Sequence, residues 1–109
     1  MEPRFIYITC PDRDEAFRVG RALVEARLAA CANVLDGMAS IYWWQGKLIT
    51  DTETVLVLKS RAELVPALTA KVQEIHRYEV PCVVALPILD GNPAYLEWIA
   101  AETQAQKGA

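Results

Sequence analysis

The sequence predicts a single α+β domain, and three observations support this fold class. Its 109 residues match the usual length of one domain. Hydrophobic residues make up 53% of the chain and charged residues 23%, as in a folded globule and unlike a disordered chain. Strand-like and helix-like segments alternate along residues 1–109, and we expect only the tail, about 104–109, to be frayed.

The first two predicted elements are a strand and a helix. Residues 5–9 form an aromatic and β-branched run that Pro11 ends, which is typical of a buried strand. Asp12 and Glu15 have the spacing of a capping box, in which each side chain satisfies a free backbone amide of the other residue. Apolar residues then recur at helical spacing on one face, which predicts an amphipathic helix to about Ala30.

Residues 31–60 predict a long β-hairpin. Gln45-Gly46 is a turn signal between two strand-like arms, and Asp36-Gly37 predicts a bulge in the first arm. An arm of about 13 residues would extend about 43 Å, beyond the roughly 34 Å diameter of a globule of this size. The hairpin therefore either projects beyond its own domain or bends strongly back onto its own core. A projecting arm needs a second chain to cover its apolar residues, so we expect a homo-oligomer built on this hairpin.

The next segment predicts a second helix whose start is ambiguous. Ser60 and Glu63 repeat the capping-box spacing, and an apolar stripe follows to Ile75. Pro66 lacks the amide hydrogen that a helix interior uses. The helix is therefore either kinked there or regular only from Pro66 onward.

The last third of the chain adds a strand and a third helix. Residues 82–86 are a β-branched run, and Asn92 is placed to cap a helix that has Pro93 at its first position. The order is then strand, helix, two strands, helix and strand, with an extra C-terminal helix. This order predicts a ferredoxin-like βαββαβ sandwich, in which the first two helices cover one face of an antiparallel sheet.

Charge and composition exclude several classes of partner. Eleven Lys and Arg against fourteen Asp and Glu give a net charge of −3, which is unfavourable for binding nucleic acid. No window has the ~20 apolar residues of a membrane span, and the N-terminus has no signal-peptide pattern. Cys10, Cys31 and Cys82 are odd in number and lack paired spacing, which favours reduced thiols. We expect a cytoplasmic protein that binds neither nucleic acid nor membranes.

Several segments resemble a known family when they are taken together. They are residues 28–34 (LAACANV), 40–47 (SIYWWQGK), Glu53 with 58–60 (LKS), 76–81 (HRYEVP) and 95–99 (YLEWI). In this order, and over nearly the whole chain, they resemble the CutA divalent-cation tolerance proteins. The resemblance implies a ferredoxin-like protomer and a homotrimer whose subunits pair strands through the hairpin of residues 31–60. It also implies a cytoplasmic protein that responds to copper and other divalent metal ions.

Two positions depart from the family pattern. Arg77 stands where the family has proline, and Cys82 stands where it has glutamate. The copper ligands described for the family are a strand cysteine and two adjacent histidines. Here Ile8 and Ile75 occupy two of those positions, and only His76 matches. The resemblance therefore does not carry that copper site over intact.

The candidate metal ligands are His76, Cys10 and Cys82. A metal site needs three or four ligands, so His76 would need Cys82, Glu79 or copies of itself in a trimer. Cys10 precedes the N-terminus of a helix, which favours a thiolate. The alternatives are structural, because a histidine after a helix meets the negative end of its dipole and free cysteines are usually buried. A bound copper or other divalent cation is not expected to be needed for folding.

A second candidate site is a cleft at a subunit boundary. Asp51 and Glu53 alternate on one strand face, which suits ligands for a hard metal ion or, with Lys47 and Lys59, a polar pocket. The alternative is an ordinary solvated or ion-paired face. The aromatic residues suit packing at a subunit interface, or the lining of a cleft for a small ligand. The predicted cleft residues are Tyr42, Trp44, Glu53, Lys59, Tyr78 and Glu79.

These features predict a cytosolic trimer that binds or senses copper and other divalent metal ions. We find no catalytic constellation and do not expect an enzyme, since an acyl-phosphate hydrolase on this fold would need a Gly-rich anion loop. The alternative is a signalling trimer of the PII type that binds a small ligand between subunits, and it rests on fold analogy.

Overall fold

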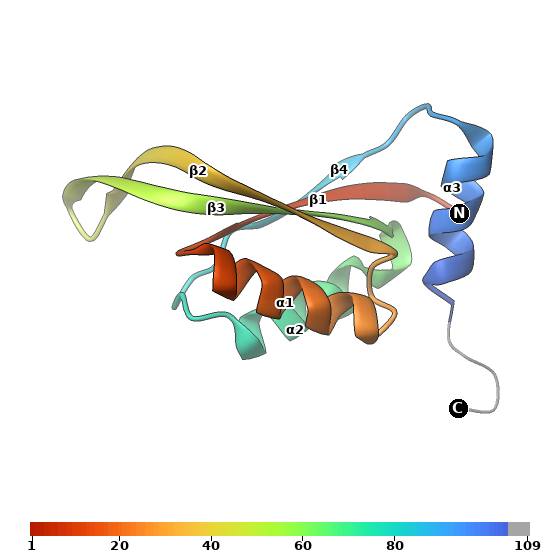
Figure 1. Cartoon of the computed structure of the whole chain (residues 1–109), viewed down its shortest axis with the longest axis horizontal. Coiled ribbons are helices and arrows are strands. Elements are labelled where there is room, and N and C mark those ends of the chain that lie inside the picture. Colours follow the sequence, from red (N-terminus) through yellow and green to blue (C-terminus); the bar gives the residue numbers. More distant parts are fainter. Residues whose placement is uncertain (105–109) are drawn as a thin grey trace.

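The computed structural model describes residues 1–104 as a four-stranded sheet with α1 and α2 on one face and α3 beside one end (Figure 1). The strands lie in the order β2-β3-β1-β4, and each neighbouring pair is antiparallel. This is the predicted ferredoxin-like arrangement. The predicted frayed tail falls largely on residues 105–109, which lie outside the described residues. The elements are β1 (Pro3–Cys10), α1 (Arg13–Glu25), β2 (Cys31–Trp44), β3 (Lys47–Arg61), the 3₁₀ turn η1 (Ala62–Leu64), α2 (Val65–Ile75), β4 (Val83–Pro87) and α3 (Pro93–Glu102).

Alternation along β1 separates a core face of the sheet from an open face. Ile6, Ile8 and Cys10 are buried, and they join one apolar cluster with side chains of α1 and α2. Tyr7 and Thr9 point to the opposite face, because successive strand residues alternate in direction. The core therefore lies between the sheet and these two helices, and the opposite face is free of α1 and α2.

Helix α1 has the predicted start, but only half of the predicted capping box. Asp12 Oδ1 accepts a hydrogen bond from the amide of Glu15 at 2.8 Å. The Glu15 carboxylate does not reach back to the cap, because it binds Arg18 and Arg77 instead. The capping prediction is therefore right for Asp12 and wrong for Glu15.

The end of α1 corrects the predicted boundary. The helix stops at Glu25 and does not continue to Ala30. Arg27 adopts a left-handed backbone with φ of 62°, and the amide of Leu28 donates to Leu23 O at 3.0 Å. This geometry closes the last turn in the manner that glycine usually provides.

Ser60 does not cap α2, contrary to the second capping-box prediction. It lies within β3, and its Oγ donates to Leu28 O at 2.7 Å. Helix α2 begins at Val65, with Pro66 in its first turn. Of the two alternatives, the helix that is regular from about Pro66 is confirmed, because the first turn makes no use of the missing amide.

The hairpin of β2 and β3 projects beyond the helices, as predicted (Figure 1). The chain extends 47 Å along its longest axis and only 31 Å and 21 Å along the others, so the hairpin does not fold back. Gly37 has a φ of 78° and lies in the predicted bulge between Leu35 and Met38. Positive φ values at Gln45 and Gly46 form the predicted turn.

The hairpin tip, defined as residues 40–48, exposes large apolar side chains. Ile41 is 71% exposed, Trp43 72% and Leu48 59%. Exposed apolar groups of this size on a projecting hairpin are typical of a surface that contacts another protein.

Helix α3 is held against the end of the sheet. Its cap is the predicted one, since Asn92 Oδ1 accepts from the amide of Ala94 at 3.1 Å. Arg27 forms an ion pair with Glu102 at 2.7 Å, which ties α3 to the segment after α1. Neither α3 nor any other helix within residues 1–104 is long and apolar enough to cross a membrane.

Candidate functional site

A cleft of about 690 Å³ lies over the open face of the sheet. β1 contributes Tyr7 and Thr9, two of its residues that point away from the core. A second side comes from β2 beyond its bulge and from Glu53 of β3, and the loop after α2 forms the third. The full lining is Tyr7, Thr9, Met38, Ser40, Ile41, Tyr42, Trp44, Glu53, Arg77, Tyr78, Glu79, Val80 and Cys82.

Most of the residues predicted for a cleft meet in this one. Lys59 is the exception, because its Nζ donates to Asn33 Oδ1 at 2.5 Å near the other end of β3. The strand between Glu53 and Lys59 spans about 20 Å, so Lys59 does not belong to the cleft of this chain. The predicted residues that do line it are Tyr42, Trp44, Glu53, Tyr78 and Glu79.

Sequence reasoning missed the part of the cleft that β1 and the bulge provide. The alternation of β1 was an available signal for Tyr7 and Thr9, because it places them opposite the buried side chains. Tyr7 Oη donates to the sulfur of Met38 at 3.2 Å, although 31 positions separate the two residues. No local pattern indicates a contact of this kind.

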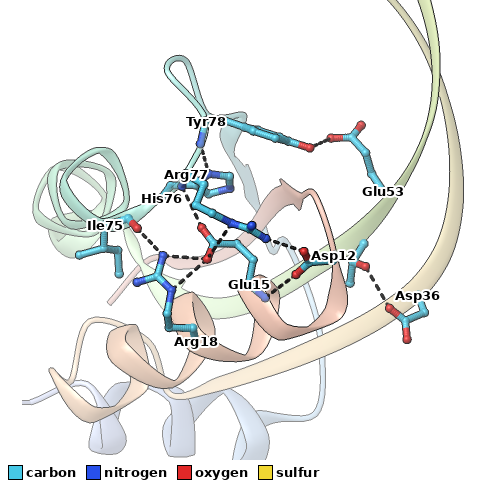
Figure 2. A network of polar contacts seen from close by, with 10 residues as sticks. Asp12, Glu15, Arg18, Asp36, Glu53, Ile75, His76, Arg77 and Tyr78 are labelled. Carbon is cyan, nitrogen blue, oxygen red and sulfur yellow. Dashed lines mark hydrogen bonds and ion pairs between the residues drawn. The ribbon is translucent and has the colours of Figure 1, made fainter.

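Glu53 provides a buried carboxylate in the cleft. The residue is only 7% exposed, and Tyr78 Oη donates to its Oε2 at 2.7 Å (Figure 2). Burial, and then the Glu53 carboxylate, raise the pKa of Tyr78 well above its ordinary value. The Tyr78 phenol is therefore protonated at neutral pH and remains a hydrogen-bond donor to Glu53.

His76 is buried next to the cleft, and hydrogen bonds occupy both of its ring nitrogens. Nδ1 accepts from the amide of Tyr78 at 3.0 Å, so the ring proton is assigned to Nε2, which donates to Thr9 O at 2.9 Å. The ring of His76 lies 4.8 Å from that of Tyr78, measured between centroids. In this arrangement neither nitrogen has a free lone pair for a metal ion.

A buried carboxylate fastens the loop after α2 to the start of α1 (Figure 2). Glu15 is 3% exposed, and its Oε2 accepts from the amide of Arg77 at 2.8 Å. Its Oε1 accepts from Arg18 Nε at 2.9 Å and lies 3.5 Å from Arg77 Nε. The Arg77 guanidinium also pairs with Asp12. We call Asp12, Glu15, Arg18 and Arg77 the clamp, and it fixes the backbone just before Tyr78.

The prediction that Cys10 is a thiolate is wrong. It is fully buried in the core, on the face of β1 opposite to the cleft. Burial, followed by the charges of Glu15, Glu53 and Asp12, raises the pKa of the Cys10 thiol to about 12. Desolvation therefore outweighs the helix N-terminus, and the neutral thiol is the form present at neutral pH.

Cys82 is the predicted metal ligand that faces the cleft. It lies beside Thr9, and burial together with the charge of Glu53 raises the pKa of its thiol. His76 and Cys82 thus both contact Thr9, whereas the side chain of Cys10 lies on the opposite face of β1. Within residues 1–104, however, no three His, Cys, Asp or Glu side chains are grouped closely enough to hold a metal ion.

Proteins of a known family are similar to this chain in both sequence and fold. A family model described as "CutA1 divalent ion tolerance protein" matches residues 4–102. "Divalent-cation tolerance protein CutA" of Thermus thermophilus is 44% identical over 98 residues, which are 90% of this chain and 95% of that protein. The crystal structure of CutA1 from Oryza sativa has a TM-score of 0.92 and 40% identity, covering 97% of each chain.

Some relatives are longer proteins. "Protein CutA 1, chloroplastic" of Oryza sativa is 43% identical over 99 residues, which are 91% of this chain but 56% of that protein. The chain therefore spans little more than half the length of that relative. Since the family model covers both the core strands and the loop that carries His76 and Tyr78, this chain belongs to the CutA1 divalent ion tolerance family.

Proposed function

We propose that this protein acts in divalent-cation tolerance as a homotrimer that binds divalent metal ions directly. The observation that carries the proposal is the buried carboxylate of Glu53 in the cleft, with Glu79 and Cys82 in the same lining. Carboxylate oxygens are ligands for hard divalent cations, and a cysteine sulfur suits copper. The cleft therefore offers oxygen and sulfur ligands together.

The trimer is part of this proposal because one chain does not complete a site. Within residues 1–104, the ligand groups are too few at any one point to hold a metal ion. The apolar hairpin tip needs a partner surface, and symmetric pairing through it would bring ligands of a second copy towards the cleft. Of the predicted ligands, Cys82 already faces the cleft, whereas His76 and Cys10 would have to leave their present contacts.

An anaerobic calorimetric titration of Cu(I), with Cu(II) and Zn(II) in parallel, tests metal binding, and the mass in the same buffer tests the trimer. We expect saturable binding with a whole-number stoichiometry per trimer, lost in Glu53→Gln and weakened in Cys82→Ser. Glu97→Gln is the matched control, because it removes the same charge from the exposed surface of α3. His76→Ala and Cys10→Ser show whether those residues join the site. No saturable binding by an intact trimer would contradict the proposal.

A second candidate function is that of a signalling trimer that binds a small organic ligand. The size of the cleft favours it, since about 690 Å³ is the volume of a small-molecule pocket and far exceeds that of one metal ion. The occupied ring nitrogens of His76 favour it as well. A rise in the melting temperature with an organic ligand, but with none of the three metals, would support this candidate over the first.

We also propose that the protein works in the cytoplasm, as its composition predicts. The rice relative is named chloroplastic, so the location of this protein needs its own test. Fractionation of the source cells, with detection of the native protein, provides that test.

A further inference from the structure

We infer that the cleft binds a small organic cation, an ammonium group carried on a compact molecule, with Glu53 as its counter-charge and aromatic side chains as its walls. The inference deepens the second candidate function above and rests on it, because it names the class of ligand. It follows from the charge of the cleft, from the nature of its walls and from its size.

The first argument is the incomplete pairing of Glu53. Its carboxylate is buried, and Tyr78 donates to Oε2, whereas the hydrogen bonds of residues 1–104 include none to Oε1. No side-chain oxygen that is fully buried lacks a hydrogen-bond partner among the described residues, so Oε1 is open to the cleft. It is the oxygen with which a cation bound in the cleft would pair.

The second argument is the sign of the charge around the cleft. Glu79 belongs to the lining, and Asp51 lies two positions before Glu53 on the same side of β3. Burial, and then the charges of Asp51 and Glu53, raise the pKa of Tyr42, which lines the same cleft. Arg77 is the cationic residue of the lining, but Asp12 and Glu15 neutralise its guanidinium. The cleft therefore favours a cation over an anion.

The third argument is the aromatic lining, which favours an organic cation over a metal ion as the ligand. Tyr7, Tyr42, Trp44 and Tyr78 all line the cleft. Aromatic rings attract ammonium groups through their negative faces, and the attraction is strongest for tryptophan. The same rings offer few ligand atoms to a metal ion. A buried carboxylate among four aromatic residues is the arrangement that recognises an organic ammonium group.

Choline and 3,3-dimethylbutan-1-ol form a matched pair of probes, because they have nearly the same shape and only choline is charged. Each is titrated into the intact oligomer by calorimetry and by tryptophan fluorescence, at constant ionic strength. We expect choline to bind at least about tenfold more tightly than the neutral alcohol, a difference that one cation–π contact or charge pair provides.

Two variants with matched controls locate the binding. Glu53→Gln and Trp44→Leu should each weaken choline binding by about tenfold or more. Glu97→Gln removes the same charge elsewhere, and Trp98→Leu removes an indole of α3 that lies outside both the lining and the hairpin tip, so both should bind choline normally. Oligomer mass and far-ultraviolet circular dichroism of each variant show that the fold is retained.

Three results would overturn the inference. They are equal affinity for choline and the neutral alcohol, unchanged choline binding in Glu53→Gln and Trp44→Leu, and no binding of either probe because a neighbouring copy fills the cleft. The metal titration on the same samples keeps the proposals apart. Metal binding without choline binding removes this inference alone, and choline binding without metal binding removes the first proposed function alone.

Discussion

The two sides of the cleft are held in opposite ways. On one side, the clamp and His76 fasten the loop that carries Tyr78 through buried hydrogen bonds to α1 and β1. On the other side, the hairpin tip carries Tyr42 and Trp44 on a two-stranded ladder whose apolar residues Ile41 and Trp43 are exposed. One wall is therefore fixed by contacts within the chain, whereas the other rests on strand pairing and would be covered by a partner in the proposed trimer.

The largest effect is expected from charges placed on the hairpin tip. Ile41→Lys combined with Trp43→Lys should convert the proposed trimer to monomers, because truncation of even one packed tryptophan costs about 3–5 kcal/mol. Light scattering or sedimentation measures the mass. Gln45→Lys is the control, since it adds a charge at the turn and should keep the trimer. A double variant that remains trimeric would show that the tip is not the interface.

Glu15→Gln should loosen the loop that carries Tyr78 without affecting formation of the proposed trimer. Arg18 and Arg77 lose the charge that they share, and the expected loss in the free energy of unfolding is about 1.5–3 kcal/mol. Urea unfolding at fixed protein concentration measures it. Glu25→Gln is the matched control on the same helix, since its exposed pair with Arg21 should contribute less than about 1 kcal/mol. Equal losses in the two variants would argue against a special role for the clamp.

Tyr78→Phe tests the link between the clamp and the cleft. It removes the donor to the buried Glu53 carboxylate, so the free energy of unfolding should fall by about 1–2 kcal/mol. Tyr95→Phe is the control, because its hydroxyl contacts only Cys31 Sγ, at 3.6 Å, among the described side chains. Urea unfolding of the pair separates the two cases. If Tyr78→Phe is as stable as Tyr95→Phe, the bond to Glu53 contributes nothing to stability.

The fold was predictable from local sequence patterns. The prediction failed at two element boundaries, where a residue took a role that the usual sequence signal does not indicate. The aromatic and β-branched run of residues 5–9 and the Gln45-Gly46 turn are strong signals, and the strand and the turn that they predict were both confirmed. The end of α1 was misplaced because Arg27 takes the left-handed conformation that usually marks glycine. The Ser60 cap was wrong because a strand continued through it and gave its hydroxyl a tertiary partner.

The cleft was only partly predictable, because its residues come from distant parts of the chain. Tyr42, Trp44 and Tyr78 were indicated by the family resemblance, and they do meet. The bond between Glu15 and the amide of Arg77 joins residues 62 positions apart, and it depends on how α1 and α2 pack. The raised pKa of Cys10 likewise depends on burial that the helix N-terminus did not reveal. Tertiary placement, and not residue type, decided these features.

The smallest expected effect is the acid dependence of what Asp12 contributes to the free energy of unfolding. The hydrogen bond from the Glu15 amide, and then Arg77, lower the pKa of Asp12 below its unfolded value of about 3.9. Its contribution to stability is therefore fully present above about pH 4 and is lost as the pH falls through the lower folded pKa. Asp12→Asn keeps a good helix cap but loses the charge that Arg77 binds, so the two proteins should differ in urea midpoint at pH 7 and converge in acid, as the pH falls through the lowered pKa of Asp12. Asp14→Asn, in the same helical turn, controls for the helix dipole. A difference that persists unchanged into acid would mean that Asp12 acts as a neutral cap and that the clamp draws its strength from Glu15 alone.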